Sequence, residues 1–277
     1  MGKDWIINSI AAMYSAPRLA IKYLRYYCTA FNGKGHGMHS PFVFQFIIKI
    51  LNDRKKYDSY ETVENLRRQL LKDSRMFVVE DFGAGSAFLR KHQRSIKSIA
   101  RNAAKSKKYG QLLYRIIKYY QPQTILELGT SLGITTSYLS LAKPDAKLIT
   151  MEGAREIASV ARQSFDKLSI KNVELIEGNF DLMLPGLLER TPVIDLAFID
   201  GNHRQEPTER YFNQLLPKMH NESILVFDDI HWSREMEQVW KTIRDHPSVH
   251  CTIDLFFIGI VFFRDEFREK QDFVIWF

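Results

Sequence analysis

The sequence lacks the features that identify disulfide-stabilised, zinc-binding and membrane-spanning proteins. Among 277 residues only two are cysteines, Cys28 and Cys251. They lie far apart and outside any C-x-x-C spacing, so they supply neither a disulfide framework nor a zinc signature. No stretch reaches the roughly 18 consecutive apolar residues of a membrane span, and residues 1–20 lack a compact apolar segment with a cleavage site. We therefore expect a cytoplasmic protein with no transmembrane segment.

Acidic residues are scarce in the first part of the chain. Residues 1–123 hold 23 Lys and Arg against 8 Asp and Glu, a net charge of +15, whereas residues 124–277 hold 16 against 24, a net charge of −8. This polarity favours an anionic partner for the first part, such as nucleic acid, a lipid surface or a phosphorylated substrate. A solvated set of basic helices is the alternative.

Short apolar runs alternate with helical patterns from Thr124 onward. This rhythm predicts an α/β fold with five parallel strands. The strands are expected at Thr124–Leu128, Lys147–Met151, Val173–Ile176, Ile194–Ile199 and Ser223–Phe227, and the crossover helices at Ile134–Ala142, Ala154–Leu168, Asp181–Glu189, Glu206–Met219 and Ser233–Asp245. Cys251–Phe257 and Ile260–Phe263 lie too close together for a helical crossover and predict an antiparallel C-terminal hairpin, which makes a seven-stranded sheet.

The residues before Thr124 are mainly helical in pattern. Basic, aromatic-rich helices are expected at Ile6–Phe31, Pro41–Leu51, Tyr60–Lys72 and Arg94–Tyr120. We predict a helical extension over residues 1–104 and the sheet domain over residues 105–277. A glycine-dense segment with His36 and His39 interrupts the helices; because these histidines have no nearby Cys or carboxylate, we interpret it as a loop rather than a metal site.

Three consecutive strand ends carry residues suited to one ligand. After the first strand, Glu127-Leu-Gly129-Thr130-Ser131-Leu-Gly133 forms a glycine turn that leads into a helix N-terminus, where a carboxylate of an amino-acid moiety would fit. Glu152 ends the second strand and could accept hydrogen bonds from both ribose hydroxyls. At the third strand end, Gly178, Asn179 and Phe180 would suit an adenine ring.

A second glycine-rich segment, Val79–Ser86, resembles such a turn by composition alone. The basic helical stretch after it contains no second strand with a terminal acid, so the βαβ unit of a nucleotide site is missing. We interpret this segment as a tight turn.

These ordered motifs, together with Ile194-Asp-Leu-Ala-Phe-Ile-Asp200, resemble those of class I S-adenosylmethionine (SAM)-dependent methyltransferases over roughly residues 105–264. The resemblance implies a Rossmann-like methyltransferase sheet and SAM as the cofactor. The segment His39-Ser-Pro-Phe-Val-Phe44 is similar to one in uncharacterised bacterial methyltransferases, a likeness that brings no substrate with it.

Acidic residues also follow the fourth and fifth strands. Asp200 comes after the fourth strand, and Asp228 and Asp229 come after the fifth. Clustered carboxylates suit Mg²⁺, Mn²⁺ or Ca²⁺, and such a cation would lower the pKa of a substrate hydroxyl. Direct hydrogen bonds from Asp200 and Asp228 to loops or substrate are the alternative.

The same arrangement resembles the metal-dependent catechol O-methyltransferase branch, and the resemblance implies Asp200, Asp228 and Asp229 as metal ligands. The sequence departs from that branch at Asp229, where the family usually has Asn, and at His203, which stands in the place of a catalytic Lys. An imidazole titrates near neutrality, so we expect His203 to act as the general base, with Asp200 as the second catalytic residue. His231 is the second candidate for the base.

The predicted function is methylation of a hydroxyl on a small molecule or sugar. The G-x-x-x-G spacing of Gly129 and Gly133 argues against an NAD-type oxidoreductase. Two alternatives stay open: a nucleic-acid methyltransferase that uses the basic first part, and a non-catalytic cofactor-binding interaction module. The acceptor cannot be identified from fold, and the aromatic-rich first helices could form a homo-oligomer interface as well as a lid.

Overall fold

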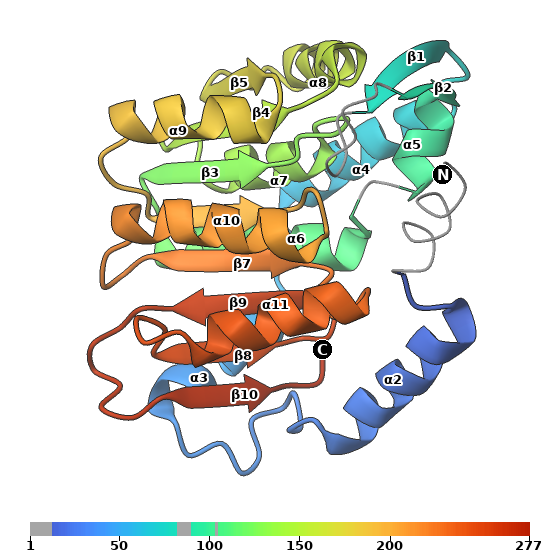
Figure 1. Cartoon of the computed structure of the whole chain (residues 1–277). Coiled ribbons are helices and arrows are strands. Elements are labelled where there is room, and N and C mark those ends of the chain that lie inside the picture. Colours follow the sequence, from blue (N-terminus) through green and yellow to red (C-terminus); the bar gives the residue numbers. More distant parts are fainter. Residues whose placement is uncertain (1–12, 82–89, 103–104) are drawn as a thin grey trace, which may run out of the picture. The chain divides into compact units, whose positions relative to one another are not determined.

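The computed structural model describes residues 13–81, 90–102 and 105–277 (Figure 1). Contacts between Cα atoms divide the chain into a terminal unit, formed by residues 1–47 and 198–277, and a central unit, formed by residues 48–197. The division falls inside strand β6 (Leu196–Ile199). The domain boundary that the sequence predicts, between residues 104 and 105, differs from this division and stays a prediction.

The central unit contains the first three predicted strands. β3 (Thr124–Leu128), β4 (Lys147–Glu152) and β5 (Val173–Glu177) run parallel, with Thr124 opposite Lys147 and Leu148 opposite Val173. The strand order in this unit is β6-β3-β4-β5. Parallel strands need helical crossovers, which cover the sheet and explain why the strand residues are apolar on both faces.

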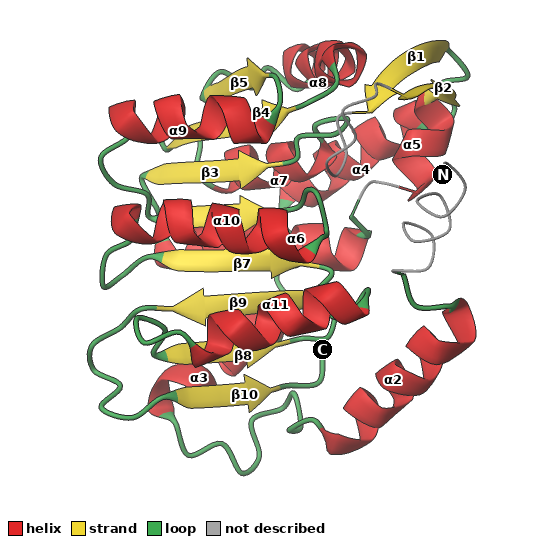
Figure 2. Cartoon of the chain, in the orientation of Figure 1, coloured by secondary structure: helices red, strands yellow, loops and turns green. Residues whose placement is uncertain are grey.

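Helices alternate with these strands along the chain (Figure 2). The helices of the central unit are α4 (Asp58–Leu70), α5 (Ile96–Asn102), α6 (Lys107–Tyr120), α7 (Ile134–Ala142), α8 (Arg155–Lys167) and α9 (Phe180–Arg190), and a π-helical turn, η1 (Ile47–Leu51), lies at the unit boundary. α7 and α8 both contact β4. α7 packs closely on α6, because a Cβ at Gly110 would lie 2.6 Å from the ring of Tyr138.

One part of the extension differs from the helical prediction. β1 (Met76–Asp81) and β2 (Arg90–Ser95) pair antiparallel, with Met76 opposite Ser95. An antiparallel pair cannot start a βαβ unit, which agrees with our rejection of Val79–Ser86 as a cofactor turn. Residues 82–89, which include most of that segment, lie outside the described residues.

The terminal unit contains the remaining strands in the order β10-β8-β9-β7-β6. β7 (Ile224–Asp228) pairs antiparallel with β9 (Ile258–Phe262), and β9 pairs antiparallel with β8 (Cys251–Asp254), which confirms the predicted C-terminal hairpin. β10 (Gln271–Val274) adds a parallel edge strand to β8 that the sequence did not predict. The helices of this unit are α2 (Ala16–Thr29), α3 (Pro41–Phe46), α10 (Gln205–Leu215), the 3-10 turn η2 (Leu216–Lys218) and α11 (Arg234–Asp245).

The observed architecture confirms the predicted mixed α/β class, a mostly parallel sheet with an antiparallel hairpin. Among residues 13–81, 90–102 and 105–277, no helix has the length and apolar character needed to cross a membrane.

Candidate active site

The loop after β3 adopts the backbone conformation that its glycines predict. Gly129 and Gly133 have φ of 113° and 79°, and Ser131 between them has φ of 49°, a left-handed value that is uncommon for a residue with a Cβ. The amides of Gly129 and Thr130 both donate to the carbonyl of Met151 on β4, each at 3.0 Å. The loop is therefore fastened to the neighbouring strand.

This loop leads into α7, whose first turn has no side-chain cap. Gly133 is the N-cap residue of α7, no side chain caps it, and the first turn contains no acidic residue. Free N–H groups at a helix N-terminus favour an anion. The carboxylate site predicted at this turn stays a prediction.

Glu127, the first residue of the motif, is fully buried in β3. Its Oε2 accepts hydrogen bonds from the hydroxyls of Thr136 at 2.5 Å and Thr150 at 2.6 Å. Burial raises the pKa of Glu127 to about 7, although the two hydroxyl donors act in the opposite direction. The pKa of Glu127 therefore lies near neutral pH. The sequence analysis did not identify Thr136 and Thr150 as the residues that position Glu127.

Glu152, at the end of β4, connects this loop to the next segment. Its carboxylate accepts from the amide of Ser131 at 2.8 Å and from the amide of Ala154 at 2.9 Å. The hydrogen bond to Ser131 stabilises the left-handed backbone of that residue. Glu152 thus has a structural role in addition to the ribose-binding role predicted for it.

The end of β5 is shaped by Gly178 and Asn179. Gly178 has φ of 136°, and a Cβ there would lie 2.9 Å from Met183 Cγ. The side chain of Asn179 accepts from the amide of Asp181 at 2.8 Å and caps α9, and half-buried Phe180 is the first residue of that helix. The predicted adenine contacts at Gly178, Asn179 and Phe180 stay predictions.

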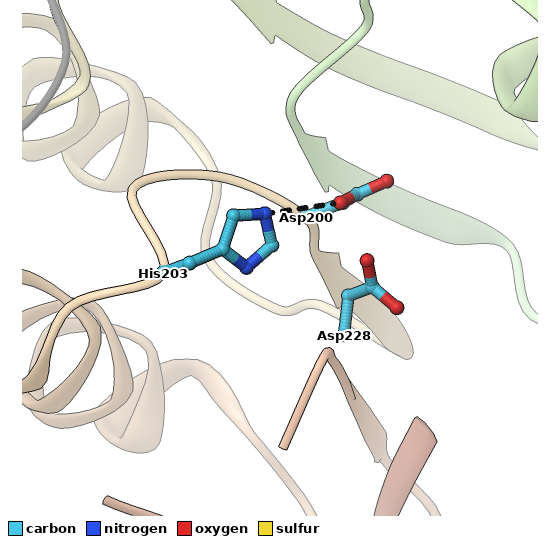
Figure 3. Close-up of side chains that lie close together, drawn as sticks. All are labelled: Asp200, His203 and Asp228. Carbon is cyan, nitrogen blue, oxygen red and sulfur yellow. Dashed lines mark ion pairs between the residues drawn. The ribbon is translucent and has the colours of Figure 1, made fainter. Parts of the chain in front are cut away.

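In the terminal unit, three side chains from two strand ends come together (Figure 3). Asp200 and His203 follow β6, and Asp228 ends β7. One ligand atom from each of the three lies within 4.8 Å of the others. Asp228 is 1% exposed, and His203 Nε2 lies 3.6 Å from Asp200 Oδ1.

The backbone of this loop explains how His203 reaches the two carboxylates. Asn202 and His203 have φ of 70° and 30°, both left-handed. Such conformations cost free energy and persist where the surroundings fix them, which is common at functional sites. Here the amide of the Asn202 side chain donates to the hydroxyl of Tyr211 on α10 at 2.7 Å. We define Asp200, His203 and Asp228 as the carboxylate–histidine cluster.

Asp229 lies beside Asp228 but is not a member of this cluster. Its backbone is left-handed, with φ of 54°, and its amide donates to the carbonyl of Phe257 at 2.6 Å. The role of Asp229 as a metal ligand stays a prediction.

His231 is held in a network of charged groups. Its Nε2 lies 2.7 Å from Asp254 Oδ2 and its Nδ1 lies 3.2 Å from Glu237 Oε1. Burial alone would lower the pKa of His231, but the hydrogen bonds to the two carboxylates outweigh burial and raise it to about 9. An imidazolium with both nitrogens occupied is not free to accept a proton at neutral pH, so the structure favours a structural role for His231.

The glycine-dense segment forms a loop, and His39 contributes to a pocket of about 530 Å³ within the terminal unit. Four phenylalanines are among the residues that line this pocket, Phe31, Phe42, Phe267 and Phe273, and none of Asp200, His203 and Asp228 is. Of the described residues, His36 and His39 belong to no group of three potential metal ligands. The interpretation of this segment as a loop agrees with the structure.

Comparison with known proteins shows that part of the chain is similar to methyltransferases. Residues 126–230 match the family model of a methyltransferase domain. The chain is 30% identical over 124 residues to a catechol O-methyltransferase of Niastella koreensis, covering 44% of this chain and 55% of that protein. It is 34% identical over 95 residues to catechol O-methyltransferase B of Danio rerio, covering 33% and 36%. The chain therefore spans about half, or less, of the length of these curated relatives.

A solved structure extends the likeness in fold. The SAH-bound methyltransferase PaMTH1 of Podospora anserina has a TM-score of 0.58 and 16% identity, with 79% of this chain and 93% of that chain covered. Its sequence identity is low, so this comparison bears on the fold alone. The comparisons therefore show that residues 126–230 are similar to a methyltransferase domain and that catechol O-methyltransferases are among the curated relatives of the chain.

Proposed function

We propose that this protein is a SAM-dependent O-methyltransferase that methylates a hydroxyl of a small molecule or sugar with the help of a divalent cation. The observation that carries the proposal is the carboxylate–histidine cluster, in a chain whose central unit contains the class I motif loop. Catechol O-methyltransferases are among the curated relatives of this chain.

The central unit offers groups that fit the three parts of SAM. The first turn of α7 suits the carboxylate of the methionine moiety, since its N-cap residue Gly133 has no capping side chain and the turn contains no acidic residue. Glu152 stands at the end of β4, where an acidic residue binds ribose hydroxyls in related folds. Gly178 leaves the end of β5 without a side chain, beside Phe180, which suits a flat base.

The carboxylate–histidine cluster fits a divalent cation by its donor set. Two carboxylates and an imidazole within 4.8 Å of one another match the ligands of Mn²⁺ and, for the carboxylates, of Mg²⁺. A cation held here would act as a Lewis acid that lowers the pKa of a bound substrate hydroxyl.

His203 and Asp200 are suited to move the hydroxyl proton. His203 is one-third exposed and can meet a substrate, and Asp200 at 3.6 Å can stabilise the imidazolium that forms. This pair would replace the lysine that the related branch uses at the position of His203. Transfer of the methyl group is an in-line displacement, so the remaining task of the protein is to position the nucleophile.

Release of SAH from SAM, measured over a panel of catechols and sugar diols with and without Mg²⁺ or Mn²⁺, tests the proposal. We expect turnover of at least one acceptor that falls by about 10²–10⁴-fold in His203→Gln, the usual contribution of a positioned base. Asp245→Asn, an exposed substitution in the same unit, is the matched control for Asp200→Asn and Asp228→Asn. Turnover that is indifferent to all three cluster substitutions would refute the assignment.

A parallel titration with Mn²⁺ separates the two roles that His203 could have. If His203 accepts the proton, His203→Gln changes the pH profile of kcat and leaves the affinity for Mn²⁺ unchanged. If His203 is a metal ligand, the same substitution weakens Mn²⁺ binding and the proton acceptor must be another group.

A further inference from the structure

Helix α2 of the terminal unit packs on its own unit with one face only. On the packed face, Tyr26 is buried and its hydroxyl donates to the carbonyl of Ile275. The ring of Tyr23 packs edge-on against Phe256, with centroids 5.1 Å apart. These contacts fix the rotation of α2 about its axis, so the residues of the opposite face are defined (α2, blue, in Figure 1).

The opposite face is apolar and exposed. Ile21, Leu24 and Tyr27 are 69%, 62% and 50% exposed, and their spacing places them on one side of the helix. Trp276, from the end of the chain, continues the surface, because its ring packs edge-on against Tyr27 at 5.2 Å. Phe31, which lies two residues past the end of α2, is also exposed. We call these five residues the outer face of α2.

The charges of α2 all have one sign. Over Ala16–Thr29 the helix contains Arg18, Lys22 and Arg25 and no acidic residue. Lys22 is paired with Glu237 at 2.8 Å on the packed side. Arg18 and Arg25 are exposed, lie seven residues apart and therefore stand along the same edge of the outer face.

From this surface we infer a function that is independent of methyl transfer: α2 docks the protein in the plane of an anionic lipid surface. Helices that lie in a membrane interface combine an apolar face containing Trp, Phe or Leu with Lys or Arg at its border. The outer face would enter the boundary between headgroups and acyl chains, and Arg18 and Arg25 would meet lipid phosphates. Tyr27 and Trp276 are the residue types that sit at headgroup level.

The charge pattern favours a lipid surface over a second copy of the chain. A symmetric dimer places a surface against itself. If the outer face were buried in such a dimer with the two helices antiparallel, Arg18 and Arg25 of both copies would lie along the same edge, with no acid on α2 to pair with them. An anionic bilayer satisfies the same arginines, since each basic residue near such a surface contributes to binding.

Co-sedimentation of the full-length protein with vesicles tests the inference. One vesicle is phosphatidylcholine, and the other contains roughly one third phosphatidylglycerol, whose negative charge attracts basic residues. We expect binding to the anionic vesicles only. Ile21→Gln/Leu24→Gln should weaken it by about tenfold or more, as expected for apolar side chains that leave water on binding, and Arg18→Gln/Arg25→Gln by about fivefold per charge at low salt.

Matched variants control for general changes in hydropathy and charge. Leu182→Gln removes an apolar side chain of α9 that is 78% exposed, and Arg54→Gln/Arg101→Gln gives the same formal net charge as the substitution of the arginine pair on α2. Both controls should bind anionic vesicles like the wild type to within about twofold, since neither changes the outer face.

Three results would overturn the inference. The first is a wild-type protein that stays in the supernatant with both vesicles. The second is a dimer in sedimentation velocity without lipid that Ile21→Gln/Leu24→Gln dissociates, because a second copy would then occupy the face. The third is nucleic-acid binding that depends on the arginines and is indifferent to Ile21 and Leu24, combined with the absence of vesicle binding.

Discussion

The burial of Asp228 beside Asp200 leads to a quantitative prediction for Asp228→Asn. Oxygen atoms of the two carboxylates lie within 4.8 Å of each other, and Asp228 is 1% exposed. Two negative charges at that distance repel each other by about 3 kcal/mol at an effective dielectric constant of 20, and partial exposure of Asp200 reduces this value. In the absence of divalent cations, Asp228→Asn should therefore raise the free energy of unfolding by about 1–3 kcal/mol.

The cation should stabilise the wild type more than Asp228→Asn. A ligand at about 100 times its dissociation constant stabilises the folded state by about 2.7 kcal/mol. For a chain of this size the corresponding rise in melting temperature is about 5–10 °C. Wild type should show this rise with Mn²⁺, and Asp228→Asn should show little of it, because the substitution removes a charged ligand.

Differential scanning calorimetry after treatment with a chelator, and again with added Mn²⁺, measures both effects. Asp245→Asn is the control, since it removes an exposed carboxylate of the same unit. The reasoning would be refuted if Asp228→Asn were less stable than wild type in chelator and were stabilised by Mn²⁺ to the same extent.

Three further predictions concern groups away from the cluster. The pKa of His231 is raised from 6.5 to about 9. The contribution of this group to stability is therefore complete below pH 6.5 and is lost as pH rises through 9. Melting curves should show that His231→Gln abolishes this loss of stability at alkaline pH. The pKa of Glu127 is raised from 4.5 to about 7, so wild type should lose stability as pH rises from 4.5 to 7, and denaturant titrations of Glu127→Gln should lack that slope. Gly110→Ala places a Cβ 2.6 Å from the ring of Tyr138 and should lower the free energy of unfolding by about 1–3 kcal/mol in urea titrations, whereas an unchanged value would show that α6 and α7 can separate freely.

Elements with strong hydrophobic patterns could be predicted from the sequence. Thr124–Leu128 coincides with β3, and the hairpin of β8 and β9 was expected because its two runs are too close for a crossover helix. β2 (Arg90–Ser95) and β10 (Gln271–Val274) were missed for a common reason. β2 contains only polar residues, and β10 has only four residues, of which two are polar, so neither has an apolar pattern of its own, and both become strands by pairing with a partner.

The candidate site was predicted in part. We predicted from the sequence that Asp200 and Asp228 lie close together, because both follow strands of one sheet, and in the structure they belong to one cluster. It did not predict that His203 would complete the group in preference to Asp229, since this depends on left-handed backbone at Asn202 and His203. Nor could spacing show that Glu152 fastens the loop after β3, because the contact depends on the rotamer of one side chain.

Calorimetric titration with SAH tests the central claim most directly. Glu152→Gln removes the charge at the end of β4, and Glu156→Gln, four residues later on α8, is the matched control. We predict that wild type and Glu156→Gln bind SAH with micromolar affinity and that Glu152→Gln binds it at least about tenfold more weakly, with melting curves confirming that the variant is folded. Absence of SAH binding to the wild type would contradict the proposal that this protein is a SAM-dependent methyltransferase.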